Sequence, residues 1–457
     1  MSNLGSAERP LRVAIVGSGP SGFYAAEELL AGKIKTKVDM YDRLPTPFGL
    51  VRYGVAPDHP KIKNVVKIYE KIAGNEAFSF LGNVQIGKDL GMKDMRNFYD
   101  AIIFACGAQT DRALGVPGED LPGSHTATEF VAWYNGHPDY RDRQFDLSQE
   151  VAVVIGQGNV SMDVSRILCK TADELKNTDI AQHALDVLAT SKIKEVHLIG
   201  RRGPVQAAFT PPEIREFGEL MDCDVVMNPQ YLKLNPESEA ELNDAVDLKR
   251  KKNFEILQEF ASRPISGKKR KFVIHFYKSP KEIKGQGHVE KLVLEKNKLT
   301  GPSGNQQAQG TDELEAMKCG LIFRSVGYRG VPIPEIPFDS KRGTFPNIEG
   351  RISDNGNPAS GLYAVGWIKR GPSGVIGTNK PDSVATVQSL LQDLAKLTPC
   401  AKPDTQAVMN FLKGKGVKVV SFDDWKKIDL AEMERGRPLG KPREKFVKIE
   451  EMLTAIK

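Results

Sequence analysis

No two cysteines of the chain are spaced as CxxC, although the sequence contains five of them. The usual signatures of a structural zinc site, a cysteine-ligated iron–sulfur cluster and a redox-active dithiol are therefore missing, and we predict no metal site. Several of the cysteines stand in apolar runs such as FACG and RILCK. We predict buried, reduced thiols in a reducing compartment at Cys106, Cys169, Cys223, Cys319 and Cys400.

Long hydrophobic runs are also missing. No uninterrupted apolar segment approaches the roughly 18 residues of a membrane span, so we predict no span. The first residues, MSNLGSAERPLRVAIVGSG, contain neither an apolar signal core nor an Arg-rich amphipathic transit segment. We expect a cytoplasmic location, and such a start is also compatible with a presequence that has been removed.

The 457 residues suggest two or three domains at about 150 residues each. Apolar residues make up 40% of the chain and charged residues 27%, which is ordinary for a globular protein with a large core. The net charge of +6 permits an acidic partner, but a solvated Lys/Arg surface explains it equally simply.

Residues 11–42 have the pattern of a dinucleotide-binding unit. An apolar strand at 13–16 leads into Gly17, Gly19 and Gly22, a helical stretch follows at 23–30, and a second strand at 37–41 ends at Asp42. The first glycine allows the tight turn, the second lets the backbone approach a pyrophosphate, and the third lets the helix pack close to the strand. The start of the helix offers unpaired N–H groups to the phosphates. We therefore predict an adenine-dinucleotide site rather than an empty glycine-rich turn.

A second, weaker copy of this pattern begins at residue 151. The strand at 151–155 is followed by Gly156 and Gly158, but Ser161 stands where Gly or Ala is usual, and its hydroxyl could cap the helix predicted at 160–170. A polar helical insertion at 171–191 precedes the next strand, at 195–199. This strand ends in Arg201 and Arg202 instead of an acid.

The residues at the ends of the two second strands predict different nucleotides. The carboxylate of Asp42 can accept hydrogen bonds from ribose hydroxyls but would repel a 2′-phosphate, so the first site should hold FAD or NAD. Guanidinium groups match a phosphate in a forked geometry, so Arg201 and Arg202 favour NADPH, although a surface pair without a ligand is the alternative. Two such sites without a dithiol indicate a bound flavin and a nicotinamide donor.

Longer motifs identify a resemblance. VAIVGSGPSGFYAAEELL, PTPFGLVRYGVAPDHPKIKNV, VIGQGNVSMDVSRIL, IGRRGPVQAAFT and GWIKRGPSGVIGTN together resemble the adrenodoxin-reductase family of ferredoxin–NADP⁺ reductases, from about residue 11 to the C-terminus. The resemblance implies hydride transfer from NADPH to FAD, then single-electron transfer to a 2Fe–2S protein. It also implies two Rossmann-like α/β domains, each of three layers with a mainly parallel sheet. The NADP domain, 109–332, is inserted into a discontinuous FAD domain, 1–108 and 333–457.

The resemblance also implies site residues. Where the family has Glu at the FAD ribose, this chain has the shorter Asp42. The implied FAD contacts, besides the glycines of the first turn, are Ser21, Asp42, Leu50, Ile86, Trp367, Gly374, Val375 and Ile376. The implied NADPH contacts are Gln157, Gly158, Asn159, Val160, Arg201, Arg202, Glu213 and Gly374. His59, Asp163 and Glu213 are the implied catalytic residues, although for His59 and Asp163 a structural hydrogen bond is an equally good interpretation.

The implied protein partner is an acidic 2Fe–2S ferredoxin. Its docking residues would be Arg215 and the basic segment formed by Lys249, Arg250, Lys251 and Lys252, unless this segment is only a solvated face. We predict no nucleic-acid binding, because no aromatic interleaving accompanies KRKK or KKRK. An NADPH diaphorase or quinone reductase on the same scaffold, and a non-catalytic flavin or nucleotide sensor, are the competing hypotheses.

Overall fold

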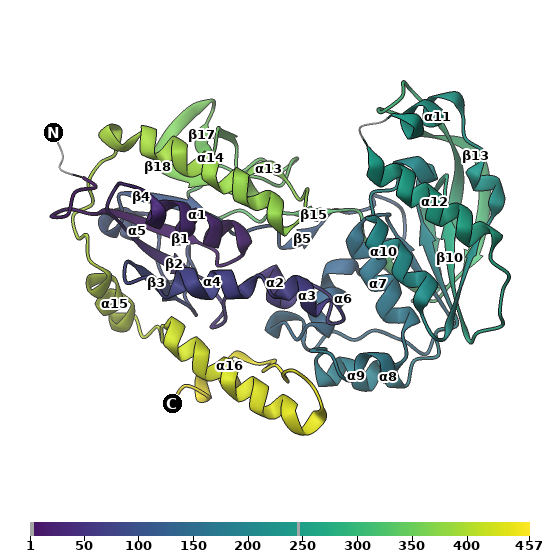
Figure 1. The fold of residues 1–457 in the computed structure, drawn as a ribbon, viewed down its shortest axis with the longest axis horizontal. Coiled ribbons are helices and arrows are strands. Elements are labelled where there is room, and N and C mark those ends of the chain that lie inside the picture. The colour runs from purple at the N-terminus through teal and green to yellow at the C-terminus, as the bar shows by residue number, and fades with distance from the viewer. Residues whose placement is uncertain (1–3, 245–246) are drawn as a thin grey trace. The chain divides into compact units, whose positions relative to one another are not determined.

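A computed structural model describes residues 4–244 and 247–457. The chain divides into two compact units, of which unit 1 contains residues 1–110 and 327–457, and unit 2 contains residues 111–326 (Figure 1). The domain boundaries predicted after residues 108 and 332 lie two and six residues from this division. Among the described residues, no helix is long and apolar enough to cross a bilayer.

Unit 1 is built on a seven-stranded sheet with the order β16-β17-β18-β4-β1-β2-β3. The five strands from β18 to β3 are parallel, and β16 and β17 extend the edge in antiparallel pairing. The strands are β1 (Leu11–Val16), β2 (Thr36–Tyr41), β3 (Phe78–Leu81), β4 (Ala101–Phe104), β16 (Asn347–Ile348), β17 (Arg351–Asp354) and β18 (Asn357–Ala364).

Helices cover both faces of this sheet because its central strands are apolar on both sides. In β1, Val13 and Ile15 join one core with α1, α4 and α14, whereas Ala14 and Val16 join the opposite core with α5 and α15. These helices are α1 (Pro20–Ala31), α4 (Val66–Ala73), α5 (Met92–Phe98), α14 (Asn379–Gln392) and α15 (Thr405–Gly414). The shorter helices of unit 1 are α2 (Leu50–Tyr53), α3 (Pro60–Lys63), α13 (Trp367–Arg370) and α17 (Ile449–Thr454).

A buried ion pair joins the last sixty residues to the N-terminal part of unit 1. Arg52 of α2 bonds Glu432 of α16 (Phe422–Gly436) at 2.6 Å, and both side chains are almost completely buried. The Arg52 guanidinium also lies over the Trp425 ring at 4.9 Å. The C-terminal segment is therefore an integral part of the unit that carries the first glycine turn.

Unit 2 contains a six-stranded parallel sheet with the order β6-β14-β7-β8-β10-β9. Its strands are β6 (Ser124–Thr126), β7 (Val151–Ile155), β8 (Glu195–Ile199), β9 (Cys223–Met227), β10 (Arg270–His275) and β14 (Leu321–Arg324). The helices packed on it are α6 (Ala127–Tyr134), α7 (Asn159–Cys169), α8 (Ala172–Leu175), α9 (Gln182–Ala189), α10 (Pro211–Glu216) and α12 (Leu248–Ser262). Helix α11 (Pro236–Asn243) packs against α12.

The other face of this sheet is covered by strands instead of helices. Val153 and Ile155 of β7 pack against an antiparallel sheet formed by β11 (Lys278–Lys284), β12 (Lys291–Thr300) and β13 (Gln307–Lys318). The predicted fold class is confirmed: both units are three-layered and their main sheets are mainly parallel.

Some local segments differ from what their residues predict. The piece at 84–86 has the pattern of a strand, but it forms only an isolated bridge between Ile86 and Leu90. The Pro and Gly residues of 43–60 predict a loop, but α2 lies within this segment. The segment 301–311 has the composition of a hairpin tip or loop, and residues 301–306 do form the tip between β12 and β13, whereas β13 begins at Gln307. Four cysteines are buried as predicted, and Cys106 is only half-buried.

Candidate functional site

The first glycine turn connects β1 to α1, and two of its glycines are required by close contacts. Gly17 has φ +112°, and a Cβ there would stand 2.4 Å from the carbonyl oxygen of Ala105. A Cβ at Gly22 would stand 2.3 Å from the Gly17 oxygen, which agrees with the close helix–strand packing predicted. A Cβ at Gly19 would have no neighbouring atom within 4 Å, so the backbone there faces open space at the start of α1.

Asp42 faces this turn from the end of β2. Its carboxylate accepts hydrogen bonds from the Ser18 hydroxyl at 2.5 Å, from the Ser18 backbone N–H at 3.2 Å and from the Leu44 N–H at 3.0 Å. Burial raises the pKa of Asp42, and these hydrogen bonds oppose the shift. The acid predicted for a ribose is therefore held against the glycine turn by the serine between the first two glycines.

The loop after β2 also closes onto the turn. The Phe48 N–H donates to the Ser18 carbonyl at 3.0 Å, and a Cβ at Gly49 would stand 3.1 Å from the Gly19 Cα. Leu50, at the start of α2, follows immediately and is 38% exposed. The segment that carries Ile86 is also close, because the Val84 N–H donates to the Asp42 carbonyl at 2.9 Å.

A segment more than 300 residues away in sequence meets the start of α1. The Ser21 hydroxyl bonds the side chain of Asn379, at the start of α14, at 3.0 Å, and the Ser383 hydroxyl donates to the Ser21 carbonyl at 2.9 Å. Asp382 accepts the Gly366 N–H at 2.6 Å. These bonds hold the loop that carries Trp367, Gly374, Val375 and Ile376 beside the first glycine turn. The sequence predicts a helix from about Asp382, and α14 begins three residues earlier, at Asn379.

The second glycine turn repeats the first in unit 2. Gly156 has φ +134°, and a Cβ there would stand 2.1 Å from the Ser325 oxygen, whereas Gly158 faces open space. The Gln157 carbonyl accepts the Ala208 N–H at 2.9 Å, and the Asn159 side chain accepts the Thr210 N–H at 2.9 Å. These two bonds fix the segment after Arg202 against the turn. Val160 is half-buried against the core of unit 2.

Ser161 does not cap α7, contrary to expectation. Its hydroxyl donates to the Gly158 carbonyl at 2.6 Å, so it satisfies an acceptor rather than one of the free N–H groups of the first turn. The N-cap residue is Gly158, which has no side chain to offer. The N–H groups at the start of α7 are consequently left to a ligand or solvent.

Arg201 and Arg202 follow β8 directly. The Arg201 carbonyl accepts the Asn297 side-chain N–H at 2.8 Å, and the Arg202 carbonyl accepts the Tyr277 N–H at 3.0 Å. Backbone contacts therefore fix this dipeptide, while the Arg201 side chain is exposed and the Arg202 side chain is half-buried. Both guanidinium groups lie at the strand end predicted to select the nucleotide.

Arg166 was not predicted from the sequence, although this residue organises two of the predicted catalytic residues. Arg166 of α7 is completely buried and forms ion pairs with Asp163 at 2.7 Å, with Glu213 at 3.0 Å and with Glu216 at 3.2 Å. One guanidinium thus joins carboxylates from α7 and α10. The i,i+3 spacing of Asp163 and Arg166 is visible in the sequence, but the contribution of α10 is not.

The remaining predicted residues lie at the surfaces of the two units. His59 is half-buried in unit 1 and precedes α3. In unit 2, Arg215 of α10 and Lys252 of α12 are exposed on helices that pack together. Lys249 instead donates to the Ala208 carbonyl at 2.9 Å, and Arg250 forms ion pairs with Glu241 and Asp247. Lys251 is half-buried.

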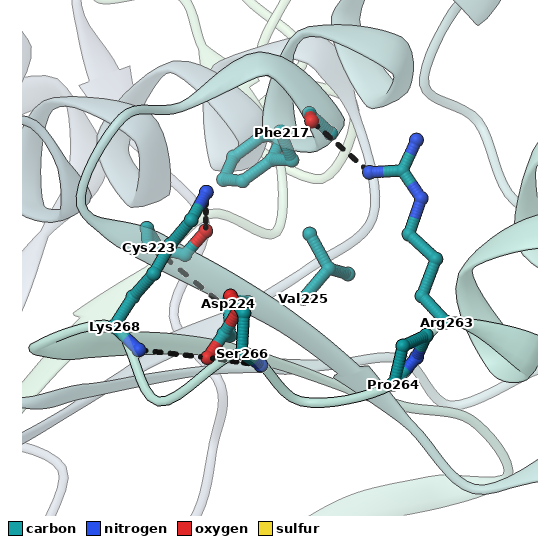
Figure 2. A pocket seen from close by; sticks show the side chains of 9 residues that line it. Phe217, Cys223, Asp224, Val225, Arg263, Pro264, Ser266 and Lys268 are labelled. Atoms are coloured by element: carbon teal, nitrogen blue, oxygen red, sulfur yellow. Dashed lines mark hydrogen bonds between the residues drawn. The ribbon is translucent and has the colours of Figure 1, made fainter.

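A cavity of about 160 Å³ lies apart from these residues (Figure 2). Asp224 lies in it and accepts the Ser266 hydroxyl at 2.5 Å and the N–H groups of residues 266–268, and Lys268 donates to the Leu220 carbonyl at 2.6 Å. Its charged groups are thus bonded to the surrounding chain, and no predicted site residue lines it. These hydrogen bonds hold the surrounding loops together, and the cavity is not assigned a ligand.

Two glycine turns, one followed by an acid and the other by two arginines, define the class. The chain is a flavoprotein oxidoreductase that binds FAD and NADP(H). A Cβ at Gly19 or at Gly158 would meet no atom within 4 Å, so the backbone is open at both turns.

The comparisons with known proteins agree with this class. Residues 11–256 match the family described as pyridine nucleotide-disulphide oxidoreductase. The chain is 47% identical to NADPH-ferredoxin reductase FprA of Mycobacterium tuberculosis, over 97% of this chain and 99% of that protein. It is 41% identical to the mitochondrial NADPH:adrenodoxin oxidoreductase of Homo sapiens, over 98% of this chain and 92% of that protein.

A solved structure gives the same result. The structure described as Mycobacterium tuberculosis FprA in complex with NADPH matches with a TM-score of 0.92 and 45% identity, covering 98% of this chain and 100% of that one. The chain belongs to the adrenodoxin-reductase-like NADPH-ferredoxin reductases, within the pyridine nucleotide-disulphide oxidoreductases. The resemblance identified from the motifs is confirmed.

The contrast between Gly17 and Gly19 can be tested by substitution. Gly17→Ala should destabilise unit 1 by about 2–4 kcal/mol, because it combines a left-handed backbone with a clash against Ala105. Gly19→Ala should change stability by less than about 1 kcal/mol but lower the bound flavin per protein, measured by absorbance. Gly32→Ala, at the other end of α1, is the control and should change neither. Full flavin retention in Gly19→Ala would contradict the assignment of this turn.

Arg166 gives a second prediction. Arg166→Met should destabilise unit 2 by about 3–5 kcal/mol in urea unfolding, because three carboxylates lose their shared buried cation. Arg141→Met removes an exposed ion pair with Asp142 and should cost less than about 1 kcal/mol. Equal losses in the two variants would show that the Arg166 cluster does not stabilise the unit.

Proposed function

We propose that unit 1 holds FAD, that unit 2 holds NADPH, and that the enzyme passes the electrons singly to an acidic 2Fe–2S ferredoxin. The observation that carries the proposal is the opposite charge at two otherwise equivalent strand ends, Asp42 in unit 1 and Arg201–Arg202 in unit 2. Domain limits of 1–108 and 333–457 for FAD, and 109–332 for NADP, are part of the proposal.

In unit 1, the glycine turn and α1 bind the FAD pyrophosphate, and Asp42 accepts hydrogen bonds from the ribose. Leu50 and Ile86 provide apolar contact from the two segments that close onto the turn. Trp367 and the backbone of 374–376 lie on the loop that Asn379 and Asp382 hold beside Ser21. Support comes from these contacts, which join four separate parts of the sequence around one turn.

In unit 2, the turn at Gln157–Val160 binds the NADPH pyrophosphate, and Arg201 with Arg202 binds the 2′-phosphate. Glu213 lies near the nicotinamide, and the buried Arg166 holds its carboxylate in place. Bound FAD supplies a ring that accepts two electrons as hydride and releases them one at a time. His59, Asp163 and Glu213 are the side chains proposed to hold or move protons during this exchange.

The ferredoxin surface is the exposed basic pair of Arg215 and Lys252. Of the five basic residues considered, these two are exposed on packed helices and are not engaged by the neighbouring carbonyl and carboxylate groups that hold Lys249 and Arg250. Opposite charge on the partner would steer its approach and make the rate fall with salt. A cytoplasmic location stays an expectation, because the adrenodoxin oxidoreductase relatives are described as mitochondrial.

The nucleotide preference can be measured directly. Replacing Arg201 and Arg202 together with Ala should lower kcat/KM for NADPH by about 10²–10⁴-fold, because two charge-assisted contacts to the 2′-phosphate are lost. The value for NADH should stay nearly unchanged, since NADH lacks that phosphate. Equal losses for both nucleotides would refute the assignment.

The acceptor is tested by stopped-flow kinetics with the holoenzyme and NADPH. We expect a purified acidic 2Fe–2S ferredoxin to be reduced much faster than a neutral quinone at low ionic strength, with an advantage that falls as salt is added. Arg215→Glu combined with Lys252→Glu should raise the KM for ferredoxin about tenfold and leave quinone reduction unchanged. Lys318→Glu, on the exposed face of β13, is the control.

Three outcomes would favour a competing function. A ferredoxin reduced no better than quinones at any salt concentration would favour a diaphorase or quinone reductase. A yellow protein that NADPH does not bleach would favour a flavin or nucleotide sensor. An equal effect of Lys318→Glu would place the docking surface elsewhere in unit 2.

A further inference from the structure

The first turn of α12 lies beside the segment that carries the paired arginines. Helix α12 packs against the short 3₁₀ turn Pro204–Gln206. This turn follows directly after Arg201, Arg202 and Gly203. Arg250 stands in this first turn, so it differs from Lys252 in its surroundings although both belong to one basic run. Only the family resemblance groups Arg250 with the ferredoxin-docking residues.

Two carboxylates hold the Arg250 side chain in a fixed position. Its Nη1 atom bonds Glu241 of α11 at 3.2 Å, and its Nε atom bonds Asp247, the N-cap of α12, at 3.2 Å. About a third of the Arg250 side chain is exposed, whereas Glu241 is almost completely buried. A surface docking residue would not need a buried acid to fix it.

Glu241 connects Arg250 to the arginine pair. The Gln206 side-chain amide donates to Glu241 at 2.8 Å, and the Gln206 carbonyl accepts a hydrogen bond from Arg202 at 3.5 Å. Burial lowers the pKa of Arg202, Arg201 and Arg250 lower it further, and Glu241 alone raises it. Arg202 is thus linked to Arg250 through Gln206 and Glu241, and this chain of contacts places Arg250 beside the segment that carries the arginine pair.

The carboxylates around these three arginines do not balance their charge, so the arrangement suits an anion with two negative charges. Asp247 and Glu241 neutralise only part of the charge of Arg201, Arg202 and Arg250, so a net positive charge is left at the end of β8. A phosphate monoester carries nearly two negative charges and accepts hydrogen bonds from guanidinium groups in several directions.

We propose that Arg250 is a third cation of the site for the 2′-phosphate of NADP(H), held in place by Glu241, and does not belong to the ferredoxin surface. The inference rests on the proposed function, because it assumes that the arginine pair binds this phosphate. It predicts two roles within one basic run: Arg250 contributes to nucleotide discrimination, and Lys252 contributes to ferredoxin docking.

The test measures binding to the flavin-loaded protein by isothermal titration calorimetry, with 2′,5′-ADP and 5′-AMP as probes. Arg250→Ala should weaken 2′,5′-ADP binding about five- to tenfold and change 5′-AMP binding less than about twofold. Arg250→Lys, which keeps the charge without the fork, should recover part of the loss. Lys318→Ala, an exposed basic residue of the same unit, should alter neither affinity.

The outcomes separate this inference from the proposal on which it rests. If wild-type protein binds 2′,5′-ADP no better than 5′-AMP, the proposed role of the arginine pair fails. If wild-type protein discriminates and Arg250→Ala discriminates equally well, only the inference fails. An unchanged nucleotide affinity together with a raised KM for ferredoxin would return Arg250 to the docking surface. Equal weakening of both probes would indicate a general structural effect and would also overturn it.

Discussion

The close approach of a carbonyl oxygen beneath each glycine turn is the constraint on which both sites depend. In unit 1 the Ala105 oxygen stands where a side chain at Gly17 would begin, and in unit 2 the Ser325 oxygen occupies the same place under Gly156. Each oxygen follows the strand next to the turn, β4 or β14, so the sheet itself fixes the turn. The helix that follows each turn begins there, and the unpaired N–H groups of a helix start favour an anion.

Within this common frame, the chemistry differs through side chains at the next strand end. Asp42 is buried against Ser18, and a second phosphate beside it would meet like charge. In unit 2 the equivalent position has guanidinium groups, and the buried Glu241 supports the neighbouring Arg250. On α7 the charges are reversed, because the buried Arg166 cation holds three carboxylates. In unit 2, Glu241 and Arg166 are thus each more deeply buried than the groups of opposite charge that they hold.

Much of the fold could be predicted from the sequence because its signals are local. The ranges predicted for β7 and β8 agree residue for residue with the structure, since the apolar run at 151–155 ends at Gly156 and the strand pattern at 195–199 ends at Gly200. What failed depends on how segments pack and on which polar group each side chain contacts. The antiparallel sheet β11–β13 covers one face of the unit 2 sheet, where helices are usual, and no short sequence motif predicts this packing. The Ser161 hydroxyl bonds a carbonyl instead of capping, and Glu241 reaches Arg250 from another helix. The individual nucleotide contacts were implied by resemblance and stay predictions.

Unit 2 is inserted into unit 1 at a point where the chain leaving unit 1 is hydrogen-bonded to the chain returning to it. The Gln109 N–H and the Thr110 hydroxyl both bond the Arg329 carbonyl, at 3.0 Å each, so the outgoing and returning chain are fastened together within unit 1. Strands β16 to β18 and helix α14, which complete the sheet of unit 1, come after this return. During translation at about 5–20 residues per second, the inserted unit leaves the ribosome whole while unit 1 still lacks β16, β17 and β18. The nascent protein must therefore keep an unfinished parallel sheet from aggregating until its last third has been made.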